Sequence, residues 1–173
     1  MQKKQVRPFI IDANVLIDYC KSDLGILELL STKISPIYIS RSTLENVNEL
    51  MESEVAKHHL IVKTPDLQTL ILATQVRGQL AVDDRETLLL AKKYGWICIT
   101  NDKPLRKECE KESVSVLWGL EPLKILVENS LIKPEKAITV AKNIRKVNPR
   151  YITAEIVKRF EEQIIEIERK LHS

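Results

Sequence analysis

Three aspartates stand where carboxylate groups could do chemistry. Asp12 follows the apolar run at 9–11, and Asp102 follows a second apolar run at 97–99. Asp84 stands in the acidic segment at 83–86, where a helical pattern begins. Carboxylates gathered in one place repel one another unless a cation holds them, and hard oxygen ligands suit Mg²⁺ or Mn²⁺. If the fold brings these residues together, the pattern predicts metal-dependent phosphodiester chemistry.

The elements that would position them alternate between strand and helix. Apolar runs predict strands at 8–12, 34–40, 60–63, 96–100 and 114–118. Helical patterns are predicted between them, at 14–20, 24–30, 43–51, 67–75, 84–94 and from about 102. This alternation predicts a three-layer α/β/α fold with a central parallel sheet. Ligands of such sheets bind outside the carboxyl ends of the strands, where Asp12 and Asp102 would lie.

The character of the chain changes after Gly119. Only helical patterns follow, at 121–129, 134–143 and 153–172, so we expect a domain at 1–118 and an all-helical C-terminal extension at 119–173. The last helix carries an apolar stripe formed by Ile156, Phe160, Ile164, Ile167 and Leu171. We expect this stripe to pack on the protein's own domain, and a dimer or partner surface is the alternative.

The acidic residues also have structural explanations, and these differ in strength. Asp83 has the chemistry of a helix N-cap, and Glu86 three residues later would complete a capping box. Asp84 has no such explanation, because it shares a helix face with Leu88 and Ala91. A carboxylate turned toward the buried side is costly unless it is paired or binds a cation. Asp84 therefore points most strongly to function.

Capping would explain the other two aspartates. Asp12 could cap the helix that follows it, although Asn14 could cap it equally well. Asp102 could cap a helix that has Pro104 in its first turn. These two residues gain their functional meaning from Asp84, because one parallel sheet would bring the three close together.

Bulk composition excludes several other classes of protein. The chain of 173 residues has 27 Lys and Arg against 24 Asp and Glu, a mildly basic balance that permits nucleic-acid binding. No apolar run is long enough to span a membrane, and the first residues do not resemble a signal peptide. Three widely spaced cysteines indicate reduced thiols and a cytoplasmic protein. The three histidines lack zinc-site spacing, and the four glycines form no phosphate-binding loop.

Three segments, at 11–18, 80–91 and 99–106, resemble the motifs of PIN-domain nucleases in the same order. The resemblance covers about residues 7–118. It implies a parallel sheet with surrounding helices, a Mg²⁺ or Mn²⁺ site and hydrolysis of phosphodiester bonds, usually in RNA. Many prokaryotic members are VapC-like toxins of toxin–antitoxin pairs. The resemblance thus also implies an antitoxin partner and a homodimer.

One position departs from the family pattern. The glutamate that usually follows the second strand falls on Asn46, with Glu45 beside it and Glu49 one turn further on. An asparagine carbonyl can bind a hard cation but contributes no charge. Glu45 could serve after a small change of register, and Glu49 could help from the face of Asn46. The departure puts metal affinity in question.

The leading hypothesis is a metal-dependent endoribonuclease. Asp12, Asp84 and Asp102 would bind the metal, and Glu45 would complete the catalytic set. Substitute ligands or groups that orient the ligands would be Asn14, Asn46, Glu49, Thr100 and Asn101. Contacts to RNA phosphates would come from Arg41, Lys103, Arg106 and Lys107.

Two other hypotheses compete with it. The first is a catalytically weakened PIN-fold module that binds RNA or protein, and Asn46 favours it. The second is an aspartyl phosphohydrolase or receiver-like domain, which also has acids at strand ends. Residues 12–14 lack the second acid that a nucleophile–acid pair would need, which makes the second alternative weak.

Overall fold

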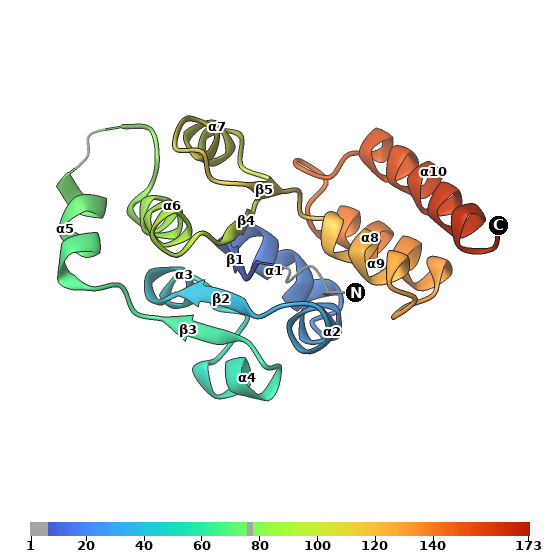
Figure 1. Ribbon diagram of the computed structural model, residues 1–173, viewed down its shortest axis with the longest axis horizontal. Coiled ribbons are helices and arrows are strands. Elements are labelled where there is room, and N and C mark those ends of the chain that lie inside the picture. Colours follow the sequence, from blue (N-terminus) through green and yellow to red (C-terminus); the bar gives the residue numbers. More distant parts are fainter. Residues whose placement is uncertain (1–6, 76–77) are drawn as a thin grey trace.

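A computed structural model describes residues 7–75 and 78–173. Its centre is a parallel sheet of five strands in the order β3-β2-β1-β4-β5 (Figure 1). The strands are β1 (Phe9–Ile11), β2 (Ile37–Ser40), β3 (Ile61–Lys63), β4 (Ile97–Ile99) and β5 (Val116–Leu117). Each lies inside or overlaps one of the predicted runs, because the apolar runs were short and bounded by turn residues.

Side chains of the central strands alternate between the two faces of the sheet, as strand geometry requires. Phe9 and Ile11 of β1 belong to the larger hydrophobic cluster, whereas Ile10 belongs to a second cluster on the opposite face. Ile99 and Cys98 of β4 divide in the same way. Both faces are thus buried, which explains why these strands are apolar throughout.

Helices cover both faces, so the fold is the predicted three-layer α/β/α arrangement with additional C-terminal helices. One layer contains α6 (Val82–Tyr94) and α7 (Lys103–Lys111), which pack with the second cluster. The larger cluster lies under α1 (Ala13–Ser22), α2 (Gly25–Lys33), α8 (Glu121–Glu128), α9 (Pro134–Val147) and α10 (Ala154–Leu171). Shorter helices connect or flank the strands: α3 (Arg41–Glu45), α4 (Glu52–Lys57) and α5 (Leu67–Gln75).

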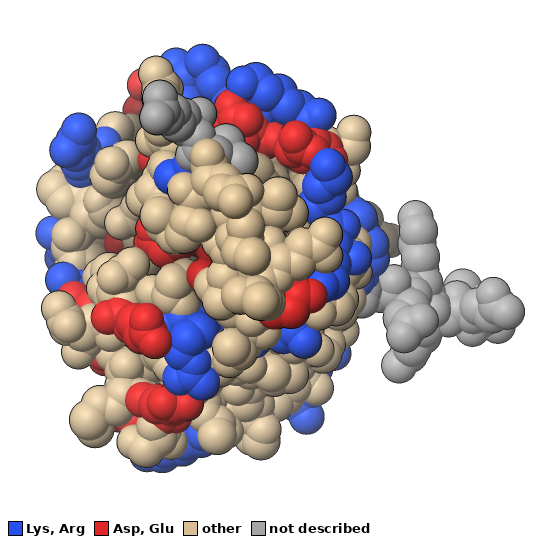
Figure 2. All heavy atoms as spheres, turned by 90° about the vertical axis from the view of Figure 1, so that its left-hand side faces the viewer, with Lys and Arg blue, Asp and Glu red and all other residues tan. Residues whose placement is uncertain are grey.

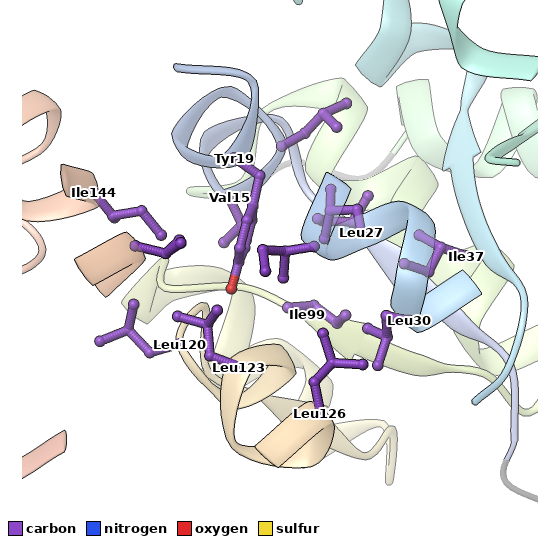
Figure 3. Packing of buried hydrophobic residues seen from close by; sticks show 14 of the residues in the cluster. Val15, Tyr19, Leu27, Leu30, Ile37, Ile99, Leu120, Leu123, Leu126 and Ile144 are labelled. Atoms are coloured by element: carbon purple, nitrogen blue, oxygen red, sulfur yellow. The ribbon is translucent and has the colours of Figure 1, made fainter. Parts of the chain in front are cut away.

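The C-terminal helices share their core with the sheet. Leu120, Leu123 and Ile144 pack in the same cluster as residues of β1, α1 and α2 (Figure 3). Tyr19 of α1 is fully buried, and its hydroxyl donates a hydrogen bond of 2.7 Å to the carbonyl of Gly119. The first residue of the extension is therefore tied to a helix one hundred residues earlier.

The apolar stripe of α10 packs mainly on the other two helices of the extension. Phe160 and Ile164 are buried, and α10 lies against α8 and α9. Leu171, the last member of the stripe, is exposed. No helix within 7–75 and 78–173 is long and apolar enough to cross a membrane.

The predicted helix at 43–51 is wrong. α3 ends at Glu45, turns follow, and a separate helix, α4, begins at Glu52. Leu44, Val47 and Leu50 are all buried. Apolar residues at a spacing of three can therefore reach the core from a segment of turns as well as from a helix. Periodicity alone cannot separate these two possibilities over so short a segment.

Candidate functional site

The candidate site lies where the strand order reverses. The chain runs outward from β1 to β2 and β3, then returns to place β4 on the other side of β1. A crevice at such a topological switch point is the usual ligand site of an open α/β sheet. Asp12 directly follows β1, and Asp102 follows β4 by three residues. Figure 2 looks onto this edge, where acidic side chains lie recessed near the middle and basic side chains gather along the margins.

Asp12 is the most deeply placed of the three aspartates, with 2% of its surface exposed. It is the N-cap of α1, and its Oδ1 accepts a hydrogen bond of 2.8 Å from the Val15 N–H. Its Oδ2 accepts a hydrogen bond from the Thr100 hydroxyl at the end of β4. Asn14, the alternative cap, is exposed on α1. Asp12 therefore combines the capping role with a position inside the sheet edge.

The Thr100 hydroxyl connects two of the aspartates. It donates to Asp12, and it accepts a hydrogen bond of 2.9 Å from the backbone N–H of Asp102. Asp102 is half-buried and caps α7, because its Oδ2 accepts from the Leu105 N–H at 2.8 Å. The expected capping role of Asp102 is confirmed, and the cap holds its carboxylate at the carboxyl edge of the sheet.

Asp84 lies in the first turn of α6, half-buried, with Leu88 and Ala91 of the same helix in the core. The predicted capping box at Asp83 is wrong, because Ala81 is the N-cap and the helix begins two residues before Asp84. The earlier start moves Asp83 into the first turn as well, where carboxylates interact favourably with the helix dipole. Asp84 is left without a capping role.

Burial and neighbouring negative charges make the carboxylates of Asp12 and Asp84 hard to ionise. Burial raises the pKa of Asp12 to about 7; the hydrogen bonds from Thr100 and Val15 lower it, and the charges of Asp84 and Asp102 raise it. Burial also raises the pKa of Asp84 to about 6, and the charges of Asp83 and Asp102 add to this shift. Buried like charges that disfavour ionisation are characteristic of functional sites, and a bound cation would relieve them.

The donor chemistry of the three aspartates fits a hard divalent cation. All are carboxylates, and a carboxylate retains acceptor positions beyond the one or two that Asp12 and Asp102 use for capping. Their spacing is wider than that of a ready-made centre, since no three Asp, Glu, His or Cys groups among the described residues form a metal-binding cluster. The aspartates act on one another electrostatically, and closer approach would have to accompany ligation.

The predicted fourth acid lies outside this group. Glu45 and Asn46 are exposed at the end of α3, and neither contributes to the raised pKa values of Asp12 or Asp84. Glu49 is also exposed, and it forms an ion pair of 3.2 Å with Lys21. The structure thus brings three of the predicted acidic residues near one another and leaves these three candidates at the surface.

Glu86 is a buried acid that sequence reasoning assigned to a cap. It is 2% exposed, and its Oε1 accepts a hydrogen bond of 3.4 Å from the Ser42 N–H at the start of α3. The neighbouring Thr87 hydroxyl lies 3.4 Å from that of Thr43. These contacts join α6 to the carboxyl end of β2. Their partners are 44 residues apart, so no local signal in the sequence predicts them.

Asn101 anchors the start of the extension. Its Oδ1 accepts a hydrogen bond of 2.9 Å from the Gly119 N–H, and its side chain is 8% exposed. Its Nδ2 is buried without a hydrogen-bond partner in the described chain. A Cβ on residue 119 would collide with this amide, so a glycine is required by close approach.

The predicted phosphate-binding cations have different surroundings. The Arg106 guanidinium stacks on Trp118, 3.7 Å from the ring centre, and also donates to the Asn101 carbonyl. Arg41 forms an ion pair of 2.9 Å with Glu52. Lys103 and Lys107 are exposed on α7. Arg106 and Lys103 adjoin Asp102 directly, and Arg41 follows β2 on the other side of the crevice.

Fold and site together define an open parallel α/β protein with acidic groups at its switch point. Among solved structures, the chain is similar to a PilT N-terminus domain protein from the hyperthermophilic archaeon Sulfolobus solfataricus P2. The TM-score is 0.50 at 14% sequence identity, and the match covers 68% of this chain and 91% of that chain. This likeness shows a PIN-like fold. No family model matches the sequence, and no curated protein matches it.

Proposed function

We propose that the chain is a nuclease that uses Mg²⁺ or Mn²⁺ to hydrolyse phosphodiester bonds in RNA. The observation that carries the proposal is the placement of Asp12, Asp84 and Asp102 at the switch point of a PIN-like sheet. Burial and like charge oppose ionisation of Asp12 and Asp84 there, which is costly in a protein without a cation to bind. A metal-binding role accounts for that cost.

A bound divalent ion would supply activation of water and neutralisation of charge on the scissile phosphate. Asp12, Asp84 and Asp102 would hold it. The chain fixes two of these carboxylates in advance, because α1 and α7 each donate a backbone N–H to them. The Thr100 hydroxyl sets the position of Asp12 relative to Asp102. Such outer hydrogen bonds orient metal ligands and support their affinity.

RNA is the proposed substrate because basic and aromatic groups adjoin the acids. Trp118 is 51% exposed and lies beside Arg106. Arg106 in turn follows Asp102 by one turn of α7. Exposed aromatic rings with neighbouring cations bind single-stranded nucleic acids by stacking on bases. Lys103 adds a positive charge next to Asp102.

The further proposal is that this nuclease is the toxin of a toxin–antitoxin pair. Its support is the resemblance of the three motifs to PIN-domain nucleases, among which VapC-like toxins are numerous. The proposal includes an antitoxin that covers the acidic crevice, a homodimer and a cytoplasmic location. Cys20, Cys98 and Cys109 are free thiols, which agrees with a reducing compartment. A short reading frame for the antitoxin directly upstream of the gene would be the expected genetic arrangement.

Calorimetric titration with Mn²⁺ tests the metal site. We expect the native chain to bind Mn²⁺ and Asp84→Asn to bind it more than about tenfold more weakly, since even groups that only orient ligands contribute about 10–100-fold. Glu128→Gln is the control, because Glu128 is an exposed acid at the end of α8 and is no proposed ligand. Absence of binding to the native chain would refute the metal mechanism.

Cleavage of RNA is the second part of the test. Asp12→Asn retains the size of the side chain and an oxygen for the Val15 N–H, but it removes the charge. We expect it to abolish metal-dependent cleavage of single-stranded RNA. Equal cleavage by the native chain and this variant would show that the activity of the preparation comes from elsewhere.

A catalytically weakened RNA-binding module is the second candidate. The observation that favours it is the surface position of Glu45, Asn46 and Glu49, away from the three aspartates. RNA binding without Mn²⁺ binding would support this function. The Mn²⁺ titration together with a measurement of RNA binding therefore separates the candidates.

A further inference from the structure

A second site lies beside the acidic crevice, between α6 and α7. The two helices, together with Leu72 of α5 and residues 78–80, line an open cavity of about 660 Å³. Arg85, Leu88 and Lys92 line it from α6, and Pro104, Lys107 and Lys111 line it from α7. In both helices these positions repeat at spacings of three or four, so a continuous face of each helix forms a wall. The volume is in the range of small-ligand sites.

Arg85 is the feature that calls for a ligand. Its Nε and Nη1 atoms are buried and have no hydrogen-bond partner among the described residues. Arg85 as a whole is half-buried, but buried N–H groups without partners are costly, and such groups in proteins usually meet an acceptor or an ordered ligand. Each of these N–H groups can donate to a phosphate oxygen, and the Arg85 side chain would have to turn toward the cavity to do so.

The charges around the cavity leave room for an anion. Its two acidic residues are already paired with lysines at its outer end: Glu108 with Lys111, and Glu112 with Lys92. Lys107 has no ion-pair partner in the described chain, and the same holds for Arg85. Two uncompensated cations therefore face a partly apolar cavity.

The position of the cavity favours a nucleic-acid strand as the source of the anion. Arg85 directly follows Asp84, and Pro104 comes two residues after Asp102, so each wall begins within two residues of a proposed metal ligand. From Asp84 to Lys92 the helix advances about 12 Å, at 1.5 Å per residue. If one phosphate of a nucleic-acid strand lay at the aspartates, the neighbouring nucleotides could follow α6 toward Lys92. Leu89, which is half-buried, offers apolar surface to a base or ribose.

We propose that this cavity is a phosphate-binding subsite for single-stranded RNA, with Arg85 as its principal contact. The proposal rests on the proposed nuclease function for its choice of RNA, and it assigns Arg85 to substrate positioning outside the metal site. A strand fits better than an acidic peptide, because a phosphate offers several oxygens to the guanidinium and the chain of phosphates continues past Lys107.

Binding without cleavage provides the test. A fluorescently labelled single-stranded RNA is titrated with the full chain in EDTA, at several salt concentrations, and followed by anisotropy. We expect Arg85→Gln to lower the affinity about tenfold and to reduce the slope of log K against log salt by about one. Arg145→Gln is the matched control, because Arg145 is an exposed arginine on α9 far from the cavity lining, and it should change the affinity less than about twofold.

Arg85→Lys keeps the positive charge but lacks the planar guanidinium, so it should bind RNA with an intermediate affinity. It also keeps the test valid if Arg85→Gln does not fold, which circular dichroism would show. Unchanged RNA affinity and salt slope in a folded Arg85 variant would overturn the proposal. If adenosine monophosphate competes with an affinity equal to that of the RNA, the cavity binds free nucleotides. If polyglutamate competes, it binds acidic peptides. Either result would overturn the assignment to an RNA strand.

The outcome is independent of the metal chemistry. If the native chain binds RNA through Arg85 but does not bind Mn²⁺, the proposed nuclease function is refuted and the proposed subsite stands. Normal Mn²⁺-dependent cleavage with no effect of Arg85 on RNA affinity would refute the subsite alone.

Discussion

The Thr100 hydroxyl at the end of β4 donates a hydrogen bond to the Asp12 carboxylate at the end of β1. These residues stand 88 positions apart, and the parallel pairing of β1 with β4 brings them together. The same hydroxyl accepts the N–H of Asp102. One side-chain oxygen thus sets the geometry between two of the three proposed metal ligands.

Thr100→Val should weaken Mn²⁺ binding about 10–100-fold without unfolding the protein, if the aspartates form a metal site. Valine has nearly the same shape but cannot donate to Asp12 or accept from Asp102. Thr100→Ser keeps the hydroxyl and should bind Mn²⁺ nearly as well as the native chain. Calorimetry on the three proteins is the measurement, and equal affinity of the valine and serine variants would contradict the role of the hydroxyl.

Asp18 should make stability depend on pH. Burial raises its pKa to about 6, and hydrogen bonds from the Asn148 amide and the charge of Lys21 lower it. A carboxyl whose folded pKa lies above its unfolded value of 3.8 contributes stability that is complete below pH 3.8 and is lost as the pH rises through 6. Asp18→Asn removes this titration and can still accept from Asn148.

The measurement is urea unfolding of the native chain and Asp18→Asn at pH 4, 5, 6 and 7. The variant should gain free energy of unfolding relative to the native chain as the pH rises. Asp12 and Asp84 titrate in both proteins, so their effects cancel in the difference. A difference that stays constant, or that changes in favour of the native chain, would disprove the assigned pKa of Asp18.

Gly119→Ala should destabilise the protein by about 1–3 kcal/mol, a typical cost of overpacking. The added Cβ would collide with the buried Asn101 amide, whose Oδ1 is held by the Gly119 N–H. Gly78→Ala is the matched control, because a Cβ there meets nothing within 4 Å. Thermal unfolding should separate the two variants, and equal melting temperatures would show that the contact at Asn101 relaxes freely.

Phe160→Ala should lower the stability of the whole chain by about 3–5 kcal/mol, as large-to-small changes in a core do. Phe160 of α10 is buried in the cluster that also contains Phe9 of the sheet. Ile165→Ala, at an exposed position of the same helix, should have little effect. Both variants should unfold in one transition, because extension and sheet share the core. A separate early transition in Phe160→Ala would show that α10 melts independently.

The parts of the structure that could be predicted are those that local chemistry determines. Asp12 and Asp102 follow apolar strands and precede helices, so their capping contacts and their place at the sheet edge follow from neighbouring residues. The alternation of strands and helices fixes the layers in the same way. The resemblance to PIN-domain nucleases added the expectation that the three aspartates form one site.

The parts that could not be predicted depend on contacts between distant segments. Glu86 fits a capping pattern in sequence, but α6 begins at Val82 and turns Glu86 toward α3. The unpaired guanidinium of Arg85 becomes visible only when α7 is packed beside α6. The turn after Glu45 satisfies the same apolar spacing as a helix. For Glu86 and for the segment after Glu45, a tertiary contact decides between two locally acceptable conformations.

Gly119 is held by the sheet domain on both sides: Asn101 accepts its N–H, and Tyr19 donates to its carbonyl. A C-terminal third transplanted from another protein would need its own glycine at this junction and the same path past Tyr19. Conversely, a chain with another residue in place of Asn101 would lose this anchor, and the change would lie directly beside Asp102. Changes in the acidic crevice and in the helical extension are therefore expected to occur together when related sequences diverge.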